Sequence, residues 1–300
     1  MPSHSRRSAR TILCGLALSL AASGMVVSAH AEDITSPLVV DGAGNYSSPI
    51  TAYGYTQPIG TISSTISATS SAHYAYGISA SSAISIDTIT SSASISASVS
   101  GNYAYAIATT SGGISIRDSI AGAITASVNN ETTGASAYGY GIYAKSGDIA
   151  LGGIQASGKI IVAPPQPEKA GRLYGISTEN GSIGITGSID GTVKVLGHGT
   201  TVYGLWAKTG DITLDSIGST GNIDVTGNFS SYGMYAKTGL TIKNAIAGNI
   251  SVTSETGNVA YALTALSNDS TIRSNLVIGS IASTSNFSVQ TGGFEACALS

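Results

Sequence analysis

Charge is scarce in this sequence, and aromatic residues are few. Charged residues make up 10% and aromatic residues 6% of the 300 positions, whereas a typical globular protein is roughly 25% charged. Hydrophobic residues nevertheless reach 42%. Disordered chains carry less apolar material and more charge, so this composition excludes a disordered chain. The protein must fold, with a surface built mainly of Ser, Thr, Asn and Gly.

The first 31 residues have the organisation of an export signal. Three arginines between residues 6 and 10 precede an apolar run from Ile12 to Val27, and Ala29-His30-Ala31 fits a small-x-small cleavage site. The run of 16 residues is shorter than the ~20 that a membrane-spanning helix needs. We therefore predict a signal peptide at residues 1–31. The paired arginines leave both the general secretory and the twin-arginine route open, with the first favoured.

Cysteine and net positive charge are lacking as well. Cleavage after Ala31 removes Cys14 and leaves only Cys297, so we expect no intrachain disulfide. It also leaves 10 basic and 16 acidic residues, a net charge of −6. Proteins that bind nucleic acid carry basic patches, and this balance argues against a nucleic-acid partner.

An aromatic-small-aliphatic triplet recurs along the chain, and each copy begins with a tyrosine. Successive tyrosines are 29, 35, 34, 29, 29 and 29 residues apart. Their positions are Tyr76, Tyr105, Tyr140, Tyr174, Tyr203, Tyr232 and Tyr261. The basic period is therefore 29 residues, with two lengthened repeats. A fixed period of this size is the signature of a repeat architecture.

Each period contains short runs in which β-branched residues alternate with polar ones. One run holds pairs such as Ile212/Leu214, a lone isoleucine such as Ile217 follows, and a further run holds pairs such as Ile223/Val225. Such alternation, bounded by Gly, Asn and Ser, indicates strands. Three strands per ~29 residues predict an all-β fold, a right-handed parallel β-helix whose stacked coils share one continuous core.

The stretch WAKTGDITLDS superficially combines the residue types of phosphate-binding and metal-binding loops. Similar segments start at Tyr143 (YAKSGDIAL) and at Tyr235 (YAKTGLTIK), which favours a structural role in the repeat over a binding site. We interpret Lys208-Thr209-Gly210-Asp211 as a corner, where glycine supplies a positive φ and aspartate bonds to local backbone. In the neighbouring coils, Ser182 and Leu240 are expected in the position of Asp211.

No constellation of residues predicts catalysis or metal binding. Asp148 and Asp211 are expected at the same corner two coils apart, about 10 Å from each other, but at exposed turns where nothing would raise the pKa of one carboxyl. His73 and His198 lack ligand partners at suitable spacing, and Cys297 falls at an anchor-tyrosine position. We therefore predict no catalytic residue, no metal, no cofactor and no enzymatic activity.

The aromatic residues are the best candidates for ligand binding. The anchor tyrosines can form a structural stack, which is the favoured interpretation, or a sugar-binding ladder. Three residues further on, Tyr143, Trp206 and Tyr235 form a second partial ladder, expected on the opposite side of the strand. Aromatic rings can stack on the apolar faces of sugars, and we name these three as candidate ligand-binding residues, with a structural role as the alternative.

The signal peptide, the repeats such as YGLWAKTGDITLDSIGSTGNIDVTG and the Ser/Thr/Asn-rich surface together resemble the passenger region of bacterial autotransporters, the type V secreted proteins. The resemblance covers roughly Tyr53 to Ser300. It implies an exported, adhesin-like or stalk-like surface protein that contacts host surfaces or glycans. It also implies an outer-membrane β-barrel translocator, on a missing part of this chain or on a separate chain, without which the product would stay in the periplasm.

We accordingly expect a signal peptide at 1–31, an N-terminal lead-in or cap at 32–52, and a β-helix at 53–300 that is incomplete at its C-terminus. Two alternatives to an adhesive surface protein stay open. One is a secreted β-helical enzyme that degrades polysaccharides, although the arginines left after signal cleavage are dispersed. The other is a purely structural surface protein that binds no ligand.

Overall fold

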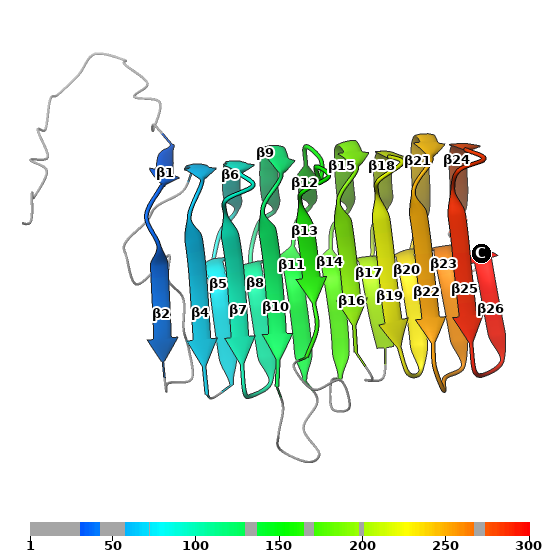
Figure 1. The fold of residues 1–300 in the computed structure, drawn as a ribbon, viewed down its shortest axis with the longest axis horizontal. Helices are drawn as coiled ribbons and strands as arrows, with labels where there is room; N and C mark the ends of the chain where they lie inside the picture. The colour runs from blue at the N-terminus through cyan, green and yellow to red at the C-terminus, as the bar shows by residue number, and fades with distance from the viewer. Residues whose placement is uncertain are drawn as a thin grey trace, which may run out of the picture.

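The computed structural model describes residues 31–42, 58–71, 73–129, 137–164, 171–197, 201–266 and 274–300. Residues 1–30 of the predicted signal peptide and His198 lie outside this part of the chain. All regular elements in the described ranges are β-strands, arranged in three parallel sheets that run the length of an elongated solenoid (Figure 1). Within these ranges, helical structure that could cross a membrane is absent.

From β3 onward, the strands are assigned to sheets A, B and C in rotation along the chain, and β1 and β2 precede them in sheets A and B. Sheet A contains β1 (Glu32–Ile34), β3 (Ile59–Ile62), β6 (Ile84–Ile89), β9 (Ile114–Ile120), β12 (Ile149–Leu151), β15 (Ile183–Ile189), β18 (Ile212–Ile217), β21 (Gly239–Ile246) and β24 (Asn275–Ile281). Sheet B contains β2 (Leu38–Gly42), β4 (Thr65–Ser70), β7 (Ser94–Val99), β10 (Ala123–Val128), β13 (Lys159–Val162), β16 (Thr192–Leu196), β19 (Asn222–Gly227), β22 (Asn249–Ser254) and β25 (Asn286–Thr291). Sheet C contains β5 (Tyr74–Ala80), β8 (Tyr103–Thr109), β11 (Tyr138–Ser146), β14 (Arg172–Asn180), β17 (Thr201–Ala207), β20 (Ser230–Ala236), β23 (Val259–Ala265) and β26 (Glu295–Leu299).

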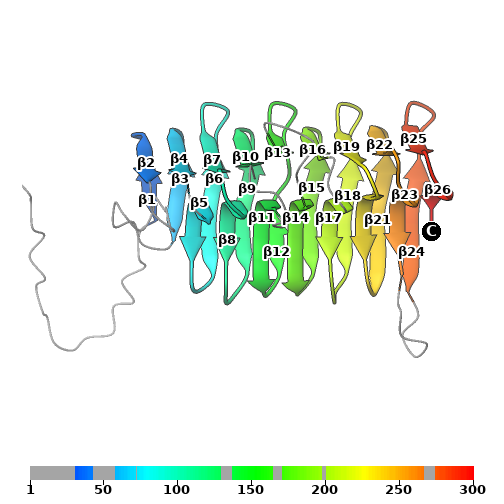
Figure 2. The same ribbon diagram turned by 90° about the horizontal axis from the view of Figure 1, so that it is seen from below.

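From β3 onward, each strand pairs in parallel with the strand three positions further along the chain, so one coil consists of one strand from each sheet. Figure 1 shows sheet B in front and sheet C behind it, with the coils advancing from β1 to β26 in the right-handed sense. The view from below shows the same coils stacked along the long axis (Figure 2). The predicted parallel β-helix with three strands per coil is confirmed.

The core is a stack of aliphatic side chains contributed by all three sheets. Ile212, Leu214 and Ile217 of sheet A and Ile223 and Val225 of sheet B are all 0% exposed. Equivalent residues lie on top of each other, because the strands pair without a shift over most of their length. The alternation in the sequence thus identified the inward positions, and burying apolar area at ~25 cal/mol per Å² is the main stabilising contribution.

One register expectation at the corners is wrong. Leu240 is paired with Ile212 and is fully buried, so it does not occupy the position of Asp211. The corner before β21 is one residue shorter than the preceding corner. β21 has one extra residue before Ile246, so that Ile246 again pairs with Ile217. The hydrophobic requirement of the core therefore overrides the literal 29-residue spacing.

The β-helical pairing begins within the described part of residues 32–52. β1 pairs with β3, and β2 pairs with β4, both in parallel. Ile34 is fully buried in the common core. The segment assigned to a lead-in or cap therefore contributes strands of its own to sheets A and B.

Candidate functional site

The corner formed by Lys208-Thr209-Gly210-Asp211 is held by hydrogen bonds between coils. The backbone N–H of Ser182 donates to Asp148 Oδ1 at 2.7 Å, and the N–H of Asp211 donates to Ser182 Oγ at 3.1 Å. The Thr238 hydroxyl in turn donates to Asp211. Side chains at this corner thus satisfy groups of the next coil, and both aspartates act as structural acceptors.

Glycine serves two different purposes at the equivalent corners. Gly147 has a positive φ of 102°, as the sequence pattern predicts for a tight corner. Gly210 has no positive φ, contrary to expectation, and is required for space. A Cβ atom at Gly210 would lie 2.3 Å from the carbonyl oxygen of Gly181. Close stacking of successive coils therefore selects glycine there.

The outer face of sheet C carries three rows of side chains with aromatic residues. The anchor row is the set Tyr76, Tyr105, Tyr140, Tyr174, Tyr203, Tyr232 and Tyr261. The edge row is the set Tyr74, Tyr103 and Tyr138, two residues before the anchor row. The tilted row is the set Tyr143, Trp206 and Tyr235, three residues after it.

The tilted row lies on the same side of the strand as the anchor row, so the expectation that it faces the opposite side is wrong. The Tyr140 and Tyr143 ring centroids are 4.6 Å apart. Strict alternation fails because both Gly141 and Ile142 face inward. A Cβ atom at Gly141 would lie 2.6 Å from Ile160 Cγ2 in the core and 2.5 Å from the Gly175 carbonyl oxygen. The small residue of each triplet therefore bends the strand and shifts the phase by one residue.

The anchor row is a continuous stack of parallel rings. Tyr140 and Tyr174 lie 4.9 Å apart with an interplanar angle of 3°, and Tyr203 and Tyr232 lie 4.8 Å apart at 9°. Such pairs contribute about 1 kcal/mol each beyond area burial. Because each ring face is covered by the next ring, the row is structural, and sugars cannot stack on the faces of its inner members.

The members of the tilted row differ from each other in burial. Tyr143 is 8% exposed and its hydroxyl donates to Glu179 Oε1 at 2.7 Å. Trp206 is half-buried and inclined by 43° to Tyr174 and 41° to Tyr203. Tyr235 is half-buried and meets Tyr232 edge-on at 80°. Trp206 and Tyr235 therefore have ring surface that no parallel neighbour covers among the described residues, whereas Tyr143 is committed to packing.

The structure brings Trp206 and Tyr235 together and keeps Tyr143 apart. Trp206 pairs with Tyr235 on the adjacent strand. Ser177 occupies the coil between Tyr143 and Trp206. Its hydroxyl is fully buried and has no hydrogen-bond partner within the described ranges. The candidate site is accordingly the pair Trp206 and Tyr235, with Tyr143 as a neighbouring structural residue.

A cleft of about 400 Å³ opens beside this pair. Its lining residues are Tyr203, Trp206, Lys208, Tyr232, Tyr235, Lys237 and Leu266. The volume lies within the ~300–1,000 Å³ that is typical of small-molecule sites. The two lysines were missed as site residues, because the repeated aromatic-Ala-Lys motif was interpreted only as the start of a corner. That recurring lysine two residues after the aromatic was the available signal.

The lysines of this cleft belong to a row of outward side chains that follows the tilted row. Lys145, Glu179, Lys208, Lys237 and Leu266 occupy equivalent positions in successive coils. Lys208 Nζ lies 3.5 Å from Glu179 Oε2. No acidic side chain of the described chain forms an ion pair with Lys237. The cleft thus combines aromatic surface with a local excess of positive charge.

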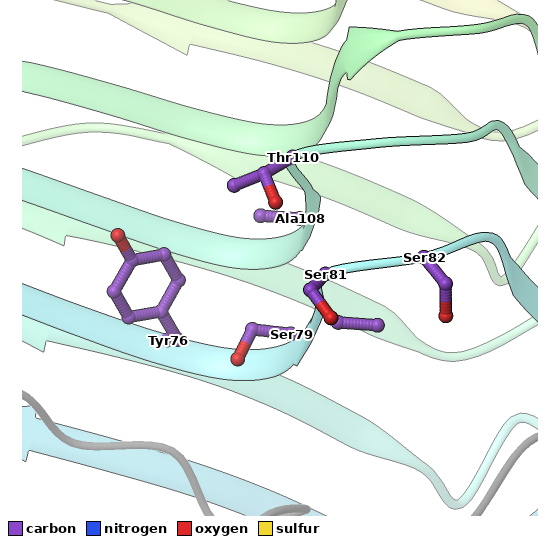
Figure 3. A pocket seen from close by; sticks show the side chains of 7 residues that line it. Tyr76, Ser79, Ser81, Ser82, Ala108 and Thr110 are labelled. Carbon is purple, nitrogen blue, oxygen red and sulfur yellow. The ribbon is translucent and has the colours of Figure 1, made fainter.

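A second depression of about 430 Å³ lies over the first coils of sheet C. Tyr76 flanks it, with Ser79, Ser81, Ser82 and Thr110 around it (Figure 3). The tilted-row positions here hold the small residues Ser79 and Ala108. Its lining is uncharged, so this depression offers hydroxyl groups and one aromatic flank without an ionic partner for a ligand.

Burial changes the acid–base behaviour of the anchor row. It raises the pKa of Tyr174 to about 12, against a partly opposing effect of Arg172. It raises the pKa values of Tyr105, Tyr140 and Tyr203 further, and neighbouring tyrosines add to the effect. These hydroxyls stay protonated at neutral pH, so they offer hydrogen bonds and no negative charge.

The described cysteine and the potential metal-ligating side chains do not come together in a site. Cys297 pairs with Tyr261 in the sheet C register, as expected for an anchor position. Among the described residues, no group of three His, Cys, Asp or Glu side chains is arranged to hold a metal ion. No protein-family model, curated protein or solved structure matches this chain.

Proposed function

We propose that this protein is an exported, non-enzymatic surface β-helix that binds glycans on the outer face of sheet C. The observation that carries the proposal is the tilt of Trp206 and Tyr235, which leaves ring surface uncovered beside an otherwise closed stack. Aromatic rings with a free face and a polar edge suit the apolar face and the hydroxyls of a sugar.

The rigidity of the solenoid supports a binding role. The aromatic side chains of the cleft stand on β17 and β20, two strands paired along their length in one continuous sheet. Trp206 and Tyr235 are positioned by the anchor rings beneath them, so little conformational entropy is lost when a ligand binds. A preorganised, shallow surface of this kind suits adhesion to a polymer better than enclosure of a small substrate.

The cellular role of the proposal rests on the sequence. The arginines, apolar run and Ala-x-Ala site at residues 1–31 support export. The resemblance to autotransporter passengers supports display at the cell surface with the help of a translocator, and host surfaces or glycans as the contacted partners. Fractionation of the producing cells tests this part: the full chain should leave the cytoplasm, and a variant without residues 2–31 should remain there.

A glycan array probed with the purified full chain tests the binding function. We expect binding to a defined set of glycans that is lost in Trp206→Ala and Tyr235→Ala. The control is Tyr74→Ala, which removes an exposed ring from the edge row at the far end of sheet C. Binding that survives both cleft substitutions would contradict the proposed site, and an array without any bound glycan would favour a purely structural role.

A further inference from the structure

The cleft on β17, β20 and β23 combines two kinds of side chain that select for one class of ligand. We propose that it binds a saccharide that carries a carboxylate, with the sugar ring against Trp206 and Tyr235 and the carboxylate at Lys208 and Lys237. The inference rests on the proposed glycan-binding function and specifies its ligand class.

Two lysines lie next to each other at one end of the cleft. Lys208 and Lys237 stand on adjacent coils, with backbones about 4.8 Å apart, at equivalent outward positions. Two lysines on adjacent coils repel each other, and a carboxylate that contacts both ammonium groups removes this repulsion. Glu179 compensates Lys208 from one side only. On the other side, Lys237 is followed by Leu266, which is 47% exposed.

The rings define where the sugar lies. Trp206 and Tyr235 of the tilted row line this cleft, and Tyr203 and Tyr232 of the anchor row lie beside them. Tyr203 contacts both tilted rings: its ring centroid lies 5.6 Å from that of Trp206 and 6.0 Å from that of Tyr235. The cleft therefore has apolar ring surface on one flank and ammonium groups on the other, which matches a sugar ring with one charged substituent.

The depression near Tyr76 is an internal comparison within the same molecule. It has a similar volume of about 430 Å³ and stands on the same sheet, but serine and alanine replace the tilted rings and no lysine lines it. A ligand recognised only by a groove beside the anchor row would fit both places. A carboxylated sugar fits only the cleft that contains Lys208 and Lys237.

Single-stranded nucleic acid also binds to aromatic residues with neighbouring lysines, but it needs a positive groove that follows its backbone. Here the row of lysines is interrupted by Glu179 between Lys145 and Lys208. The chain as a whole carries a net charge of −3. A local patch of two lysines on an acidic protein favours one carboxylate over a chain of phosphates.

Trp206 is the only tryptophan of the sequence, so its fluorescence reports on this cleft alone. The full chain is titrated with sialyllactose and with a galacturonic acid trisaccharide, and in parallel with lactose and with the methyl ester of the trisaccharide. We expect at least one acid to shift the Trp206 emission, at least tenfold more tightly than its neutral counterpart. Added salt should weaken this binding, because screening reduces the ionic contribution.

Charge variants test which residues provide the selectivity. Lys208→Gln and Lys237→Gln should each weaken binding of the acid by about tenfold, as expected for loss of a hydrogen bond to a charged group, and leave the neutral sugar unaffected. Lys159→Gln, an exposed lysine on sheet B, is the control and should change nothing. Glu179→Gln should strengthen binding by about two- to fivefold, because it frees Lys208 from a surface ion pair. If the lysines had a purely structural role, the lysine variants and Glu179→Gln would not change the affinity in opposite directions.

The outcomes separate this inference from the proposed function. Equal binding of acid and ester, unchanged affinity in both lysine variants, or a response to a thymidine oligonucleotide without one to either acid would overturn the inference. If the glycan array shows only neutral ligands, the proposed function stands and the acidic ligand class is wrong. If the array shows no ligand and neither acid moves the Trp206 signal, both fail.

Discussion

Alkaline pH should unfold this protein through its tyrosine stack. Tyr105, Tyr140 and Tyr174 of the anchor row are buried and Tyr203 is half-buried, and burial raises the pKa of each. Above pH 10, the ordinary pKa of tyrosine, the unfolded chain releases these protons while the folded chain keeps them. The stabilisation from the neutral stack is therefore fully present below pH 10 and is lost as the pH rises towards the folded-state values.

The magnitude follows from proton linkage. Each retained proton lowers the free energy of unfolding by about 1.4 kcal/mol per pH unit. For Tyr174, the window from 10.0 to about 12 corresponds to roughly 3 kcal/mol. The four tyrosines together should cost about 4 kcal/mol between pH 10 and pH 11, a large part of the ~5–15 kcal/mol that stabilises a typical domain.

Urea unfolding followed by far-ultraviolet circular dichroism, repeated at several pH values from neutral to strongly alkaline, measures this slope. Tyr140→Phe is the matched variant, because the ring stays in the stack and the Tyr140 hydroxyl has no hydrogen-bond partner in the described part of the chain. It should leave stability at neutral pH nearly unchanged. At alkaline pH it should reduce the slope of the free energy of unfolding against pH by the contribution of one proton, about 1.4 kcal/mol per pH unit. A stability that stays constant from pH 9 to pH 11, or an unchanged slope in Tyr140→Phe, would refute the reasoning.

Three further experiments, two of them with a matched control substitution, test the packing. Ile212→Asp places an unpaired charge in the core and should lower the free energy of unfolding by several kcal/mol. Asp211→Ala removes one exposed hydrogen bond and should lower it by only about 1 kcal/mol. Similar losses of stability in urea unfolding would contradict the assignment of Ile212 as inward and Asp211 as outward. Gly204→Val should destabilise by about 2 kcal/mol or more, since a Cβ atom there would lie 2.4 Å from the Gly233 carbonyl oxygen, whereas Gly184→Val meets no atom within 4 Å and serves as the control. Ser177→Ala should raise the melting temperature, because it removes a buried hydroxyl whose desolvation is uncompensated; a clear decrease would show that this hydroxyl is satisfied.

The aromatic face shows why the site could be predicted only in part. Tyr143, Trp206 and Tyr235 occupy equivalent positions in the repeat, and the sequence identified them as one set. Their different roles depend on the neighbouring coils. Glu179 accepts the hydroxyl of Tyr143 from the next coil, and Lys237 contributes to the Trp206 cleft from another. Contacts between coils are set by register, and the local sequence does not contain them.

The sequence by itself determined the period, the strands and the inward side chains, because in a solenoid each residue meets its own equivalent one repeat away. Local alternation is then sufficient to predict the parallel β-helix and its core. Only the tertiary structure decided three points: the small residue that turns Trp206 and Tyr235 to the anchor side, the shortened corner that places Leu240 in the core, and the meeting of rings and lysines in one cleft. The first is a change of alternation within a strand, the second is a one-residue shift between stacked coils, and the third follows from the unshifted pairing of neighbouring coils. The packing of one coil against the next fixes all three.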